Sequence, residues 1–146
     1  MVDLKRQSEL RDAIELLYFG YRSFTDRADR ILEKRGLGRV HHRILYFIGR
    51  RPGLSVGGLL EVLAVTKQAL NAPLRQLIQM GLVVQVAGES DRRVRSLRLT
   101  GTGEALEAEL SGVQMDQLGE TFGGAGEGAE AGWRLVMAGL AKQSFG

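Results

Sequence analysis

Four arginines stand within seven residues of one another, at Arg92, Arg93, Arg95 and Arg98, and Asp91 precedes them. Guanidinium groups at this density suit a polyanion, because they bind phosphate oxygens and enter the narrow minor groove of DNA. Such an arginine binds better if it is held extended beforehand, and Asp91 is suitably placed to hold Arg93. Charge that merely protects an edge strand is the alternative, but it accounts less easily for four arginines and an aspartate.

A second polar group follows Thr66, whose side chain is suited to cap a helix over residues 67–80. One face of this helix is apolar, and the opposite face near its start carries Lys67, Gln68, Asn71 and Arg75. Glutamine and asparagine pair with adenine, whereas lysine and arginine pair with guanine or phosphate. We expect Gln68 and Asn71 to read bases; an ordinary solvated polar face is the alternative.

The elements that must position these groups form a recognisable order. Ser55 is a good cap for a short helix over 56–63, and a turn of about three residues leads from it to the helix over 67–80. After Gly81 the apolar period changes to two, which predicts strands at 82–86 and 94–99 around a polar tip. The pattern is that of a helix-turn-helix followed by a β-hairpin wing.

Pro73 conflicts with the helix that contains it. Proline cannot donate a backbone hydrogen bond and disfavours helical geometry at Ala72, at a cost of about 3 kcal/mol in a helix interior. We expect a kink or a loosened first turn and a half, which would re-aim Gln68 and Asn71. Simple tolerance of proline near a helix start is the alternative.

Long helices flank this central part. An apolar seam at spacings of three and four predicts a helix from about residue 5 to Lys34, and its members are Leu10, Ile14, Leu17, Tyr21, Phe24, Ala28 and Ile31. A second helix fits 39–51. After the wing, a helix begins at Thr100 or Thr102, and a last one follows a segment at 119–132 with six glycines. These glycines predict that the two final helices are broken or loosely joined.

Charge is distributed unevenly along the chain, although the net charge is only +3. Residues 39–98 hold 10 Lys/Arg against 3 Asp/Glu, whereas residues 99–146 hold 2 against 7. A basic block of this kind favours a polyanionic partner, or else forms a solvated basic face. A charged N-terminus and the lack of any apolar run near the roughly 18 residues of a membrane span predict a cytoplasmic protein with no membrane partner.

Other chemistries find little support. The chain has no cysteine, which excludes disulfides and thiolate metal sites. Adjacent His41 and His42 point about 100° apart on a helix and lack further ligands, so we expect no metal and no cofactor. The glycine runs lack the lysine of a phosphate-binding loop, and no nucleophile–base set is evident, so we expect no catalytic residues and no enzyme.

The wing sequence "DRRVRSLRLT" resembles the D-x-R-x5-L-T signature of the MarR (multiple-antibiotic-resistance regulator) family, with matches at Asp91, Arg93, Leu99 and Thr100. The likeness extends over most of the chain. It implies a homodimeric bacterial or archaeal transcription regulator whose first and last helices pair, and whose wing arginine, here Arg93 oriented by Asp91, enters the minor groove. It also implies a possible small anionic aromatic ligand in a cleft at Tyr18, His41 and Arg43.

The sequence therefore predicts a mainly α fold with a small β-hairpin wing, a winged helix-turn-helix with long N- and C-terminal dimerisation helices. We expect a dimerisation helix at 1–38, a DNA-binding lobe at 39–100 and further dimerisation helices at 101–146. The expected function is sequence-specific binding of double-stranded DNA, as a homodimeric repressor on a pseudo-palindromic operator. A winged-helix module for protein–protein assembly is the alternative. The expected DNA-binding residues are Ser55, Thr66, Lys67, Gln68, Asn71, Arg75, Arg92, Arg93 and Arg95.

Overall fold

The computed structural model describes residues 3–88, 93 and 95–143. Within these residues it contains six helices and two strands: α1 (Leu4–Glu33), α2 (Arg39–Arg50), α3 (Val56–Leu63), α4 (Lys67–Gln79), β1 (Val83–Ala87), β2 (Arg95–Leu99), α5 (Gly101–Ala125) and α6 (Ala129–Ala141). The fold is mainly α with a small wing, as the sequence predicts. None of the described helices combines the length and the apolar character that crossing a membrane requires.

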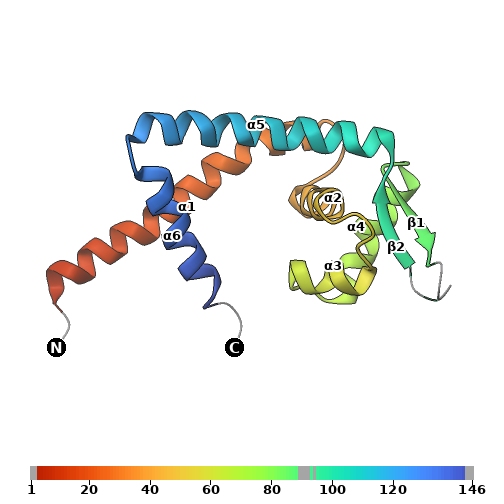
Figure 1. Cartoon of the computed structure of the whole chain (residues 1–146), viewed down its shortest axis with the longest axis horizontal. Coiled ribbons are helices and arrows are strands. Elements are labelled where there is room, and N and C mark those ends of the chain that lie inside the picture. The colour runs from red at the N-terminus through yellow and green to blue at the C-terminus, as the bar shows by residue number, and fades with distance from the viewer. Residues whose placement is uncertain (1–2, 89–92, 94, 144–146) are drawn as a thin grey trace.

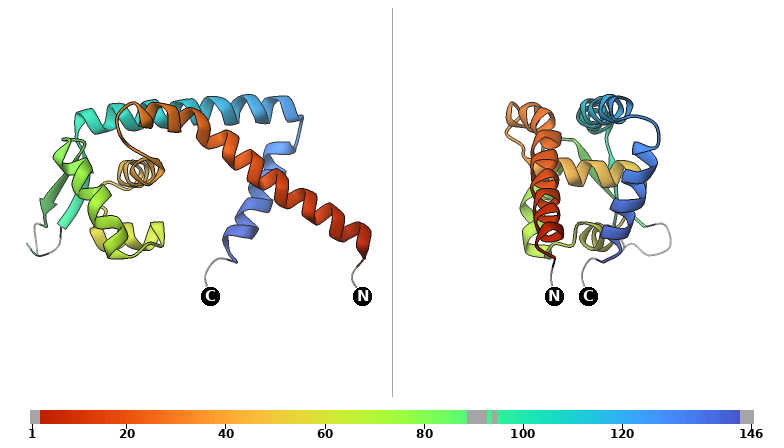
Figure 2. Two further views of the ribbon diagram at one scale, coloured as in Figure 1. Left: turned by 180° about the vertical axis from the view of Figure 1, so that it is seen from behind. Right: turned by 90° about the vertical axis from the view of Figure 1, so that its left-hand side faces the viewer.

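The other elements are arranged along helix α5 (Figure 1). It begins at the wing, and the lobe formed by α2, α3, α4 and the wing lies beneath its first half. The C-terminal part of α1 packs along α5, and its N-terminal part points away from α5. Helix α6 turns back from the far end of α5. Both described ends of the chain therefore lie on the side away from the wing, as the views in Figure 2 also show.

Side-chain caps fix where the helices of the lobe begin. Oγ of Ser55 accepts a hydrogen bond from the Gly58 N–H at 3.0 Å, and Oγ1 of Thr66 accepts one from the Ala69 N–H at 3.1 Å. Each cap satisfies a backbone donor that the first helical turn leaves unpaired. The turn between α3 and α4 contains Ala64 in the left-handed conformation, with φ 53°. The predicted bounds of both helices are accordingly correct to within one residue.

The wing is an antiparallel pair in which Val83 lies opposite Leu99 and Ala87 opposite Arg95. Strand β1 is shifted by one residue from the prediction, and β2 begins one residue later than predicted and ends at the predicted residue. An isolated bridge extends this pairing, because Ser55 lies opposite Ser96 and the Leu97 N–H donates to the Leu54 carbonyl at 2.8 Å. The start of α3 is thereby tied directly to the wing.

One apolar core underlies the lobe and the start of α5. Its fully buried members come from α1, α2, α3, α4, both strands and α5, and they include Leu32, Ile44, Ile48, Leu59, Leu70, Leu77, Val83, Leu97, Leu106 and Leu110. The leucines that the sequence places on the inner face of α4 are among them. Packing in this shared core thus holds the helix-turn-helix against α5.

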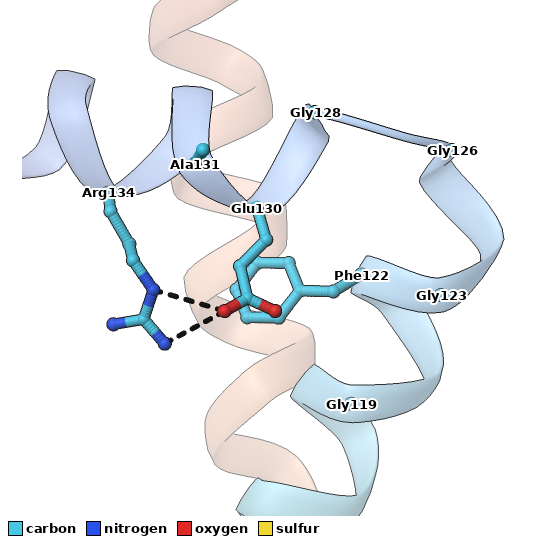
Figure 3. Close-up of a pocket in the computed structure, with 8 residues that line it drawn as sticks. All are labelled: Gly119, Phe122, Gly123, Gly126, Gly128, Glu130, Ala131 and Arg134. Carbon is cyan, nitrogen blue, oxygen red and sulfur yellow. Dashed lines mark hydrogen bonds and ion pairs between the residues drawn. The ribbon is translucent and has the colours of Figure 1, made fainter.

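The interruption between the last two helices is shorter than the glycine-rich segment at 119–132 predicts, because only residues 126–128 separate α5 from α6. Helix α5 continues through Gly119, Gly123 and Gly124 and ends at Ala125, just before Gly126, where φ is 100°. Gly128, with φ 84°, completes the turn into α6. Figure 3 shows this corner, an open hollow of about 590 Å³. The Arg134 guanidinium donates to the Glu130 carboxylate at its rim.

Most of the predicted seam of α1 is not buried within one chain. Ala28 is buried, but Leu10, Ile14 and Leu17 are exposed, Ile14 by 67% and Leu17 by 51%. Helix α6 has no buried residue, and Trp133, Leu135, Val136 and Leu140 are exposed. Although α1 and α6 overlap in Figure 1, the right-hand view of Figure 2 separates them, so neither covers the other.

Candidate nucleic-acid interface and the adjoining cavity

Helix α4 presents the expected polar face to solvent. Lys67, Gln68, Asn71 and Arg75 are all exposed, whereas Leu70, Leu74 and Leu77 on the opposite face are buried. Exposed donors and acceptors near a helix N-terminus are what reading of base edges in a major groove requires. The structure therefore leaves all four predicted side chains accessible on one element.

Pro73 lies inside α4 without interrupting it. The helix is continuous from Lys67 to Gln79, and its cap at Thr66 is formed. The expected loosening of the first turn is thus not seen. Thr66 and Leu70 anchor that turn, which keeps Gln68 and Asn71 within the helix, N-terminal to Pro73.

Ser55 and Thr66, both predicted to bind DNA, cap the helices that they precede. Ser55 is half-buried and Thr66 is exposed, and the side-chain oxygen of each accepts a backbone hydrogen bond as a cap. A hydroxyl that accepts one bond still carries a proton that it can donate. Either side chain can therefore cap its helix and bind a phosphate oxygen at the same time.

The described arginines of the wing are exposed at Arg93, Arg95 and Arg98. Arg95 and Arg98 lie on β2 and point to opposite faces of the hairpin, as alternation requires. Asp91 and Arg92 lie outside the described residues, so the orienting contact predicted for Asp91 is not described. Helix α4 and the basic wing are neighbours, because β1 follows α4 after only three residues and packs against it.

A cavity of about 480 Å³ adjoins the lobe where α1, α2 and α5 meet. Its walls include Phe24, Phe47, Met115 and Leu118 as apolar surface, and Tyr21, His42 and Arg43 as polar groups. Of the three residues predicted for an effector cleft, the structure brings only Arg43 to this cavity. Tyr18 does not line it, and His41 faces α4 instead.

Charged and polar side chains in the cavity are partly paired. Arg39 Nε lies 3.0 Å from Asp29 Oδ2, and this carboxylate raises the pKa of Arg39. Arg43 Nη2 donates to the Tyr21 hydroxyl at 2.6 Å, so Tyr21, which is 44% exposed, is not the core residue its place on the seam suggests. Burial lowers the pKa of His42, which favours the neutral form of its imidazole.

The two histidines of α2 face different parts of the protein. His42 faces the cavity, whereas His41 is buried and contacts Gln76 of α4 at 2.9 Å. Among the residues that the structure describes, no cluster of three or more histidines, cysteines or carboxylates is placed to hold a metal ion. The sequence predicts that the two side chains point in different directions, but it does not indicate that His41 faces α4 and His42 faces the cavity.

A capped helix pair, an exposed polar recognition helix and a basic wing define the winged helix-turn-helix class of DNA-binding proteins. Within this class the chain is 48% identical over 129 residues to the HTH-type transcriptional regulator PetP of Rhodobacter capsulatus, which covers 88% of this chain and 78% of that protein. The sequence model of the MarR family matches residues 35–94. The chain belongs to the MarR family, whose members are DNA-binding transcription regulators and not enzymes.

Solved structures share the fold at lower identity. Streptococcus pneumoniae FabT, determined in complex with DNA, is 21% identical with a TM-score of 0.73, and the match covers 96% of each chain. NadR, determined in complex with 4-hydroxyphenylacetate, is 22% identical with a TM-score of 0.73, over 88% of this chain and 91% of NadR. Both likenesses extend beyond the lobe to the long helices.

Proposed function

We propose that the protein is a homodimeric repressor that binds a pseudo-palindromic operator in double-stranded DNA. The observation that carries this proposal is an exposed Gln68/Asn71 face on α4, a helix that packs against an arginine-rich wing. Gln68 and Asn71 read bases in the major groove, and Lys67 and Arg75 bind phosphate or guanine. Arg93 enters the minor groove, while Ser55, Thr66, Arg92 and Arg95 bind the backbone.

A second copy of the chain is the proposed cover for the exposed apolar faces of α1 and α6. Many large apolar side chains exposed along two helices mark an interaction site. The exposed side chains include Ile14 and Leu17 on α1 and Trp133 and Val136 on α6. The N-terminal part of α1 and all of α6 lie at the end of the molecule away from the wing (Figure 1). Pairing there leaves both lobes free, which matches the two half-sites of a palindrome.

Selection of bound duplexes from random DNA tests this proposal. The expected result is a pseudo-palindrome whose half-site centres lie about 10–10.5 base pairs apart, or a multiple of this, because recognition helices related by a two-fold axis occupy successive turns. Binding should weaken with salt with a logarithmic slope of about −0.9 for each neutralised phosphate. Recovery of no sequence, together with no binding at low salt, would favour protein–protein assembly as the function instead.

Loss of the wing arginine should weaken DNA binding strongly. We expect Arg93→Ala to reduce affinity for the selected duplex by about 2 kcal/mol, the scale of one good groove contact. Asp91→Ala should cost less, because it removes the orientation of the guanidinium and not the group itself. Titration by fluorescence anisotropy measures both, with Arg27→Ala on α1 as the charge-matched control. Parent-like binding by both wing variants would refute these roles.

A small anionic aromatic ligand is the proposed occupant of the cavity between α1, α2 and α5. Its ring would contact Phe24, Phe47 and Met115, and its carboxylate would meet Arg43. This chemistry corresponds to the ligand of NadR. 4-Hydroxyphenylacetate is therefore the first probe, and release of DNA in the millimolar range is the expected result.

Arg43→Ala should abolish the response to 4-hydroxyphenylacetate while leaving DNA affinity without ligand unchanged. The reason is that Arg43 donates to the ligand carboxylate from the cavity wall and lies away from the exposed face of α4. Arg27→Ala, which removes an exposed arginine of α1 outside the cavity, is the control. If the parent responds and Arg43→Ala responds equally, the ligand does not bind as proposed.

A further inference from the structure

His41 occupies a buried position between the start of α2 and the recognition helix. Its Nδ1 accepts a hydrogen bond from the Gly38 N–H at 3.0 Å, and its Nε2 lies 2.9 Å from Oε1 of Gln76. An acceptor role for Nδ1 places the proton of the neutral ring on Nε2, which therefore donates to Gln76. The imidazole thus connects the backbone at the N-terminus of α2 to the side chain of a residue on α4.

Helix α4 is weakened internally near the residue that His41 holds. Pro73 has no N–H, so the carbonyl of Ala69 lacks its usual partner four residues on. The backbone is consequently less constrained between the reading residues at 68 and 71 and the C-terminal half of the helix. Gln76 lies three residues beyond Pro73, where a contact can restrain that second half.

Polar contacts between α4 and the other helices are scarce. Between described residues, the contact of His41 with Gln76 is the one side-chain hydrogen bond that joins α4 to another helix. The remaining anchors of α4 are apolar side chains, Leu70, Leu74 and Leu77, which resist separation of the helix from the core. Apolar packing sets which face of the helix is buried, and a hydrogen bond of fixed geometry adds a directional restraint on the rotation of the helix about its own axis.

We propose that His41 is a positioning residue that sets the rotation of α4, and thereby the discrimination between DNA sequences. The inference rests on the proposed function. Base reading depends on rotation because a hydrogen bond weakens steeply when its angle departs from linearity. Phosphate contacts by long basic side chains tolerate such a change. Loss of the contact should therefore reduce binding to the selected duplex more than binding to unrelated DNA.

Gln76→Met tests this directly, because it removes the acceptor oxygen and keeps the length of the side chain. Gln76→Glu retains an acceptor and should restore the parent behaviour. Gln79→Met makes the same change at an exposed position of the same helix and is the matched control. The readout is the ratio of affinities for the selected duplex and a scrambled duplex. We expect this ratio to fall about tenfold in Gln76→Met, the effect of losing one base contact.

His41→Gln separates the two contacts of the imidazole. A glutamine at this third helical position can still accept from the Gly38 N–H, as in a capping box, but it is placed to bond back to its own helix and not to Gln76. The ratio should fall as in Gln76→Met, and the double variant should show no further loss, because both changes remove the same bond. Circular dichroism at the assay temperature confirms that each variant is folded.

Two results would overturn the inference while leaving the proposed function intact. One is a parent-like ratio in both Gln76→Met and His41→Gln. The other is an equal fall in affinity for both duplexes that follows the loss of thermal stability, which would assign His41 a structural role only. If the parent itself binds no duplex, the proposed function fails, and this inference fails with it.

Discussion

Replacing Gly103 with alanine is expected to lower the free energy of unfolding by about 3 kcal/mol, at the upper end of the usual cost of overpacking. A Cβ atom at this position would lie 2.0 Å from the carbonyl oxygen of Leu82 and 2.9 Å from its carbonyl carbon. Both atoms belong to the backbone, so no side chain can rotate to relieve the overlap. Either the first turn of α5 or the start of β1 must move.

The same contact is part of the base of the wing, so the variant should also lose DNA affinity. The Leu82 carbonyl accepts from the Thr100 N–H at 3.1 Å, and the Thr100 hydroxyl donates to the Gly81 carbonyl at 2.6 Å. Displacing α5 would break these bonds and tilt the hairpin relative to α4. Loss of affinity measured at a temperature where the variant remains folded would report this displacement.

Gly101→Ala is the control for Gly103→Ala. It lies in the same first turn of α5, but a Cβ atom there would meet nothing within 4 Å. Because alanine favours a helix more than glycine does, the control should be unchanged or slightly more stable in urea denaturation. Equal stability of the two variants would show that α5 and β1 do not approach each other as closely as described.

Local signals explain why the lobe was predictable. The bounds of α3 and α4 follow from Ser55 and Thr66, whose caps depend only on residues within one turn. The alternation of the wing likewise needs no tertiary information. The course of α5 was not predictable in this way, since glycine adopts helical angles at 119, 123 and 124 yet positive φ at 126 and 128. Nothing in a run of glycines indicates which one ends the helix.

The cavity shows a second limit of sequence reasoning. Both His41 and His42 are buried, and their separation of about 100° around α2 sends one to α4 and the other to the cavity. Which side each residue faces depends on where α1 and α5 pack, and that is a tertiary property. The contact between Tyr21 and Arg43 joins residues 22 positions apart in the chain and is equally invisible in the apolar period of α1.

Leu17→Glu is expected to convert the proposed dimer to a monomer and to reduce operator affinity by about 100-fold or more, because two linked lobes bind far more tightly than one. Leu17 is 51% exposed in the single chain, so the change should leave the fold of each chain intact. At a two-fold interface the variant would bury two unpaired carboxylates, and each buried charge costs several kcal/mol. Sedimentation equilibrium measures the mass, and anisotropy titration measures the affinity.

Ser8→Glu provides the matched control, since it adds the same charge to α1 at an exposed position outside the apolar seam. It should remain dimeric and bind the operator like the parent, which separates the effect of the interface from that of net charge. A Leu17→Glu protein that sediments as a dimer would show that the seam is not the interface. A monomer with undiminished affinity would show instead that one lobe suffices, which would remove the reason to expect a palindrome.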